Sequence, residues 1–96
     1  MRTPFKLNAS LWELPSAHIG DIPSKHIDTT LRQHPCIHLP DYTLAPSADM
    51  WTLMFQGNDF IVINDLAEGL SIRFTDSAQT DLAEKLLAII EPPKAT

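Results

Sequence analysis

The segment that most constrains the fold is 50–74, which reads MWTLMFQGNDFIVINDLAEGLSIRF. In each of the stretches 51–55 and 70–74, every second residue is large and apolar, and such alternation is typical of a strand with one buried face. Gly57 and Asn58 tolerate positive φ and separate two apolar runs by two residues, which predicts a tight hairpin turn. The stretch DLAEG provides a second turn. Segment 50–74 therefore predicts a three-stranded antiparallel meander.

The residues after this meander predict an amphipathic helix. Asp76 or Ser77 is positioned to be its N-cap. When successive residues are placed about 100° apart, the polar side chains fall on one half of the helix and the apolar ones on the other. The apolar set is Ala78, Leu82, Ala83, Leu86, Leu87, Ile89 and Ile90. Pro92 and Pro93 end the helix and leave the short tail 92–96.

The first half, 1–46, holds six of the eight prolines, so we expect short elements joined by turns there. Alternation in FKLNASLWEL predicts one strand that ends near Pro15. The stretch SKHIDTTLRQ has Ser24 as a candidate cap and Ile27 and Leu31 four residues apart, which predicts a short helix. The whole chain, 1–96, is thus predicted to be one α+β domain. An antiparallel sheet of four or five strands would pack against the C-terminal amphipathic helix.

Composition and charge disfavour several classes of function. The chain has 96 residues, 44% of them hydrophobic, and a net charge of −5, which fits one soluble globular domain. Segment 47–96 carries eight acidic and three basic side chains, which disfavours nucleic-acid binding and suits a basic partner surface. The apolar runs are far shorter than the roughly 20 residues that span a bilayer, and no secretion signal is visible. The single cysteine suits a reducing compartment, so we expect a cytoplasmic protein.

The segment RQHPCIHLPDY contains the cluster His34, Cys36 and His38. If the chain is extended there, these three side chains point to one side and Ile37 and Leu39 to the other. Imidazole and thiolate groups on one strand face could bind zinc or copper. A fourth ligand would have to come from His18, His26 or an acid such as Asp41. The other interpretation is that the three polar residues are the solvent side of a strand.

Catalytic equipment is not visible in the sequence. Cys36 lacks a positioned base and the local signatures known around catalytic cysteines. Asp65 and Glu68 share a turn and could approach each other as a general acid and base, but acidic residues in turns are usually solvated. Glycine-rich phosphate loops, nucleophile elbows and zinc-protease helix motifs are absent. We therefore interpret the chain as more suited to binding than to catalysis.

The function that these exclusions favour is that of a small protein-binding or regulatory module without a cofactor. Met50 and Met54 lie on the face of their strand opposite Trp51, and the sequence has only one helix with a broad apolar side. Since one helix cannot cover both faces of a sheet, we expect Met50 and Met54 to belong to a surface for a protein partner or a homodimer. The alternative is a protein that binds zinc or copper through His34, Cys36 and His38.

Overall fold

The computed structural model describes residues 5–8, 11–16, 22–45, 47–65 and 69–91. In chain order, its elements are β1 (Phe5–Asn8), β2 (Leu11–Pro15), α1 (Ser24–Gln33), β3 (Ile37–Ala45), β4 (Ala48–Phe55), β5 (Asn58–Asp65), β6 (Gly69–Phe74), the 3-10 turn η1 (Ser77–Gln79) and α2 (Thr80–Ile90). The fold is α+β, as the sequence predicts, with six strands instead of four or five. Within the described residues, neither helix is long and apolar enough to cross a membrane.

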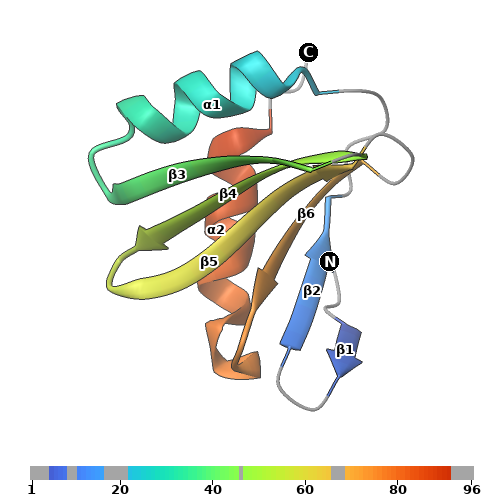
Figure 1. Cartoon of the computed structure of the whole chain (residues 1–96). Coiled ribbons are helices and arrows are strands. Elements are labelled where there is room, and N and C mark those ends of the chain that lie inside the picture. Colours follow the sequence, from blue (N-terminus) through green and yellow to red (C-terminus); the bar gives the residue numbers. More distant parts are fainter. Residues whose placement is uncertain (1–4, 9–10, 17–21, 46, 66–68, 92–96) are drawn as a thin grey trace, which may run out of the picture.

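All six strands pair antiparallel in one sheet, in the order β1-β2-β6-β5-β4-β3 (Figure 1). The predicted meander is confirmed as β4, β5 and β6, with β5 in its centre. β3 extends the meander beside β4, and the β1–β2 hairpin extends it beside β6. Because β2 and β3 lie on opposite sides of the meander, the chain between them crosses the sheet, and α1 belongs to that crossing (Figure 1).

Both helices pack into one hydrophobic core on the same face of the sheet. The strands contribute alternate residues to this core, including Trp51, Leu53 and Phe55, which are at most 2% exposed. The helices contribute Ile27 and Leu31 from α1, and Ala83, Leu86, Leu87 and Ile90 from α2. The apolar face predicted for the C-terminal helix is thus largely confirmed. Ala78 is the exception, because it lies in η1 and is exposed.

A capping box begins the 3-10 turn η1 that leads into α2, whereas α2 itself, with Gln79 as its N-cap, and α1 have no side-chain cap. In this box the Asp76 side chain accepts a hydrogen bond from the backbone N–H of Ala78, at 2.9 Å. The Gln79 side chain accepts one from the backbone N–H of Asp76, at 3.1 Å, which completes a capping box. The N-cap of α1 is Pro23, without a side-chain cap. Ser24 was expected to be this cap and instead donates its hydroxyl proton to Asp49 on β4.

Two turns differ from the sequence expectation. The β4–β5 turn is centred on Gln56 (φ 50°) and Gly57 (φ 79°), one residue earlier than predicted, and Asn58 pairs with Phe55 instead. Positive φ at both central residues is what a type I′ turn requires. The segment predicted as one N-terminal strand is a hairpin of two strands, in which Lys6 lies opposite Trp12. The connection between these strands, 9–10, lies outside the described residues, and the alternation of apolar residues from Phe5 to Leu11 does not indicate a break there.

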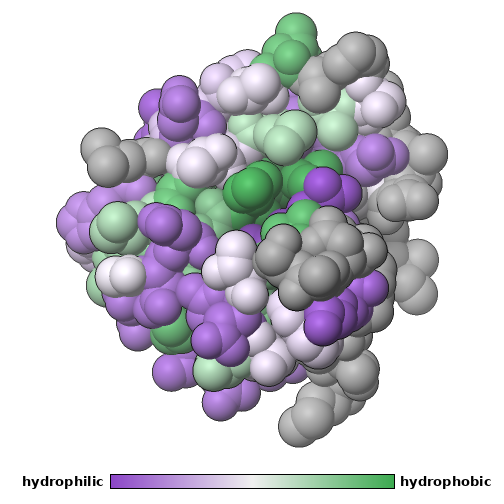
Figure 2. Space-filling view, turned by 60° about the horizontal axis from the view of Figure 1, so that its bottom comes forward, coloured by the Kyte–Doolittle hydropathy of each residue, from purple (hydrophilic) through white to green (hydrophobic). Residues whose placement is uncertain are grey.

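The opposite face of the sheet carries no helix in the described part of the chain (Figure 1). Met50, Met54 and Ile61 are half-buried on this open face, and Ile63 is buried. Glu13 and Arg73 form an ion pair across β2 and β6, with 3.0 Å between Oε1 and Nε. The view of Figure 2 shows hydrophobic side chains gathered near the middle of the surface and bordered by hydrophilic ones. Met50 and Met54 thus lie opposite the core, as the alternation predicts.

Candidate binding site

A pocket of about 320 Å³ lies between α1 and the adjoining strands β3 and β4. Its walls are formed by Ser24, Lys25, Asp28, Arg32, Tyr42 and Trp51. The four residues from α1 are spaced one, three and four apart, which places them along one side of the helix. Ile27 and Leu31 on the same helix are fully buried in the core. α1 therefore uses one side to pack on the sheet and another to line the pocket, whose volume can accept a side chain.

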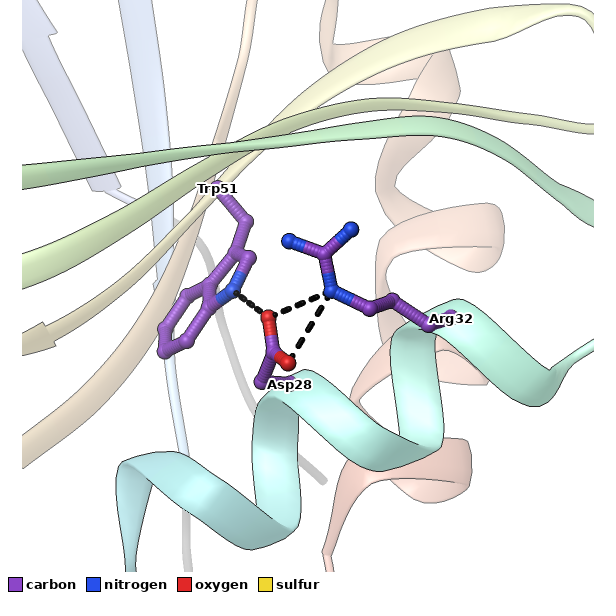
Figure 3. Close-up of polar contacts among 3 residues, drawn as sticks. All are labelled: Asp28, Arg32 and Trp51. Carbon is purple, nitrogen blue, oxygen red and sulfur yellow. Dashed lines mark hydrogen bonds and ion pairs between the residues drawn. The ribbon is translucent and has the colours of Figure 1, made fainter.

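Trp51, Asp28 and Arg32 form a connected set of polar contacts at this pocket (Figure 3). Trp51 Nε1 donates to Asp28 Oδ1 at 3.0 Å, and Arg32 Nε donates to Asp28 Oδ1 and Oδ2 at 2.9 and 3.0 Å. Trp51 is fully buried, whereas the side chains of Arg32 and Asp28 are 49% and 37% exposed. The hydrogen bond from Trp51, supported by Arg32, lowers the pKa of Asp28 against the opposing effect of burial.

Asp49 holds a second set of contacts that joins α1 to β3 and β4. The hydroxyl groups of Ser24 and Tyr42 each donate to one oxygen of the Asp49 carboxylate. The hydrogen bond from Ser24, followed by that from Tyr42, lowers the pKa of Asp49. The hydrogen bond from Tyr42 to Asp49 also raises the pKa of Tyr42. The centroid of the Tyr42 ring lies 5.5 Å from that of the Trp51 ring. Each shift moves the pKa of its group further from neutral pH, whereas a general acid or base needs a pKa close to the working pH.

β3 forms one edge of the sheet, because β4 pairs with one side of it and no strand of the described residues pairs with the other. Its first half has an irregular register between His38 and Asp41 and contains Pro40. Its second half, 42–44, is exposed and contains no charge and no proline. Since bulges, prolines and charges are the features that prevent strand addition, residues 42–44 are the open half of this edge.

Two side chains on this open half, Tyr42 and Leu44, are the large hydrophobic residues most exposed in the described structure, at 43% and 74%. Tyr42 lies opposite Trp51 and Leu44 opposite Asp49, so both are on the pocket side of the sheet. We refer to the pocket and residues 42–44 together as the α1–β3 groove. This groove combines an open backbone edge, exposed apolar side chains and a polar pocket.

His34, Cys36 and His38 do not lie on one strand face. His34 follows the end of α1, Pro35 and Cys36 form a turn, and of the three only His38 belongs to β3. The reason is Pro35, since the residue before a proline disfavours the helical conformation and the chain turns there. His34 Nδ1 accepts from the backbone N–H of Cys36 at 3.1 Å. Within the described residues, no three His, Cys, Asp or Glu side chains group as a metal site requires, so the geometry gives no support to zinc or copper binding.

The residues of the groove were not singled out by the sequence patterns. Asp28 and Arg32 are four apart on a predicted helix, which could have indicated an ion pair. No local pattern connects Asp28 with Trp51, because that contact depends on α1 crossing the sheet. Of the two acids considered as a catalytic pair, Asp65 ends β5 and Glu68 lies outside the described residues.

No protein-family model matches the chain, and no curated protein and no solved structure is significantly similar to it. The α1–β3 groove is therefore the basis on which a function is argued.

Proposed function

We propose that this protein is a protein-binding module that holds an extended segment of a partner in the α1–β3 groove. The observation that carries the proposal is the open edge at residues 42–44, directly beside the pocket. An extended segment that adds to a sheet edge gains main-chain hydrogen bonds, and alternate side chains of that segment can enter adjacent pockets. α1 supplies the second wall of such a groove, with Lys25 and Arg32 facing the bound segment.

The exposed side chains of the groove supply the apolar contribution to binding. Tyr42 and Leu44 lie two residues apart on one face of β3, which matches the repeat of an added strand. A partner strand would remove both side chains from water, and burial of apolar surface is the main favourable term in association. Tyrosine is also among the residue types that dominate binding energy at protein interfaces.

Panning a random library of linear peptides against the full chain tests this function. We expect enriched peptides with apolar residues at alternate positions, and we expect Leu44→Lys to weaken their binding about tenfold or more, because a charge on an open edge opposes strand addition. Affinity is measured by fluorescence polarisation. Thr52→Lys is the matched control, since Thr52 is exposed on β4 but on the other face of the sheet. Failure to enrich peptides, or equal losses in both variants, would contradict the proposal.

Met50 and Met54 define a second candidate surface. The observation that favours it is the open face of the sheet, which no helix of the described residues covers. This surface fits association of two copies better than capture of an extended segment, because a sheet face offers no unpaired backbone groups. Its test is the oligomeric state of the protein in solution.

A further inference from the structure

We infer that the α1–β3 groove selects a partner segment with an aspartate or glutamate side chain, whose carboxylate pairs with Arg32 and Lys25. This inference rests on the proposed function and adds the chemistry of the residue that enters the pocket. It follows from which polar groups of the pocket already have partners and which do not.

Most polar groups around the pocket are engaged within the protein. Trp51 and Arg32 donate to Asp28, while Ser24 and Tyr42 donate to Asp49. Ser24 Oγ also accepts a hydrogen bond from Asn64 Nδ2, at 3.0 Å. A cationic guest would have to share carboxylates that already accept hydrogen bonds from described residues, three at Asp28 and two at Asp49.

The polar groups of the pocket that lack a partner among the described residues are hydrogen-bond donors. The two terminal nitrogens of Arg32 and the ammonium group of Lys25 have no partner among the described residues. In Figure 3 the terminal nitrogens of Arg32 point away from Asp28, and only Nε faces that carboxylate. Asp28 is in turn held by the buried ring of Trp51. Arg32 is thus pre-oriented, with a fork of N–H groups that matches a carboxylate.

The charge balance around the pocket selects among anions. Lys25 and Arg32 contribute two positive charges, and Asp28 and Asp49 contribute two negative ones. Both acids are ionised at neutral pH, and the pKa of each is lowered from its ordinary value. Because the positive and negative charges around the pocket balance, each additional negative charge of a guest is left without an offsetting charge. A singly charged carboxylate, which the free fork of Arg32 and the nearby ammonium group can pair with, is therefore a better match than a doubly charged phosphate.

A double-mutant cycle between peptide and protein tests the inference. The probes are the best peptide from the library and its amide analogue, with Asp→Asn or Glu→Gln at the selected acid. We expect the amide to bind wild-type protein about tenfold more weakly, as the loss of a charge-assisted hydrogen bond implies. In the double variant Arg32→Gln and Lys25→Gln, acid and amide peptides should bind within about twofold of each other. Lys85→Gln on the exposed side of α2 is the matched control and should retain the full preference.

The outcomes separate this inference from the proposed function. If acid and amide peptides bind wild type equally while Leu44→Lys still weakens binding about tenfold or more, the carboxylate preference is wrong and the groove function stands. If the enriched peptides are basic, or if a phosphoserine peptide binds more tightly than the acidic one, the carboxylate assignment is overturned as well. If free glutarate binds as tightly as the peptide and Leu44→Lys does not affect it, the pocket is a small-molecule site and both proposals fail.

Discussion

Trp51 and Asp28 are joined by a hydrogen bond of 3.0 Å between Nε1 and Oδ1, which connects β4 to the middle of α1. The indole is fully buried, whereas the carboxylate is partly in water and also holds Arg32. This single contact therefore satisfies a buried donor and positions the cationic group of the pocket. A buried N–H without a partner would cost free energy, so the contact couples core stability to the geometry of the groove.

Trp51→Phe should lower the free energy of unfolding by about 1–3 kcal/mol, through lost ring volume and the lost hydrogen bond. In an Asp28→Ala background the hydrogen bond is already absent. The loss in free energy of unfolding caused by Trp51→Phe should therefore be smaller there than in wild type, by about 0.5–1.5 kcal/mol. Urea denaturation of the four proteins measures both numbers. Equal costs in the two backgrounds would show that the hydrogen bond adds nothing to stability.

The carboxylate of Asp28 in the groove and that of Asp49 beside it should make the protein sensitive to acid. The pKa of Asp28 and that of Asp49 are lower in the folded state than the ordinary value of 3.8. The folded state therefore binds fewer protons than the unfolded state in this range, and stability falls as the pH drops below that value through the folded-state pKa. In Asp49→Asn, thermal unfolding between about pH 5 and pH 2 should show a shallower loss of stability.

Asp59→Asn is the control for this titration, because the Asp59 carboxylate is exposed and has no hydrogen-bond partner among the described residues. It should reproduce the wild-type profile. A profile for Asp49→Asn that is as steep as that of wild type would mean that Ser24 and Tyr42 do not stabilise the ionised carboxylate.

The sequence patterns predicted the parts of the fold that depend on local periodicity. Alternation in segment 50–74 predicted the meander, and the apolar stripe on 78–90 predicted the helix that covers it. The patterns did not predict features that depend on contacts between residues far apart in the sequence. Ser24 resembles a cap in sequence but bonds to Asp49, which only the crossing of α1 brings near it. The N-terminal hairpin was missed because the alternation of apolar residues runs from Phe5 to Leu11 without a break between the two strands.

The candidate site was less predictable than the fold. The pattern around His34 and Cys36 was conspicuous in the sequence, yet it assumed an extended chain where Pro35 produces a turn. Trp51 was predicted only to be a strand residue, and Tyr42 was not singled out. Their importance comes from the position of β3 at the sheet edge and from the polar side of α1 beside them, and neither follows from local spacing.

The β4–β5 turn offers a direct test of the corrected register. Gly57 has a φ of 79°, and an added Cβ would meet no atom within 4 Å, so the cost of Gly57→Ala is a backbone cost alone, about 1–2 kcal/mol. Gln56 also has positive φ, at 50°. Gln56→Asn creates the Asn-Gly pair that type I′ turns prefer and should raise the urea midpoint. If Gln56→Asn lowers it, the turn is not centred on these two residues.

The open face of the sheet leads to a prediction about self-association. Met54 is half-buried there and lies between His38 on β3 and Asp59 on β5. If a second copy covers this face, sedimentation equilibrium from low to high micromolar protein should detect a dimer, and Met54→Lys should convert it to monomer because a charge would then be buried at the interface. Thr29→Lys on the exposed surface of α1 is the control.

Measurement of Leu44→Lys in the same experiment separates the open face from the β3 edge. If Leu44→Lys disrupts the dimer and Met54→Lys does not, then two copies associate through their edges, and the groove is occupied by a second copy instead of a partner segment. A monomer at every concentration, with a stability loss in Met54→Lys as large as that of a core substitution, would place Met54 in the protein interior. That result would remove the argument that Met50 and Met54 form a binding surface. A large loss of stability on introducing a lysine would mean that the side chain at position 54 is already covered within one chain.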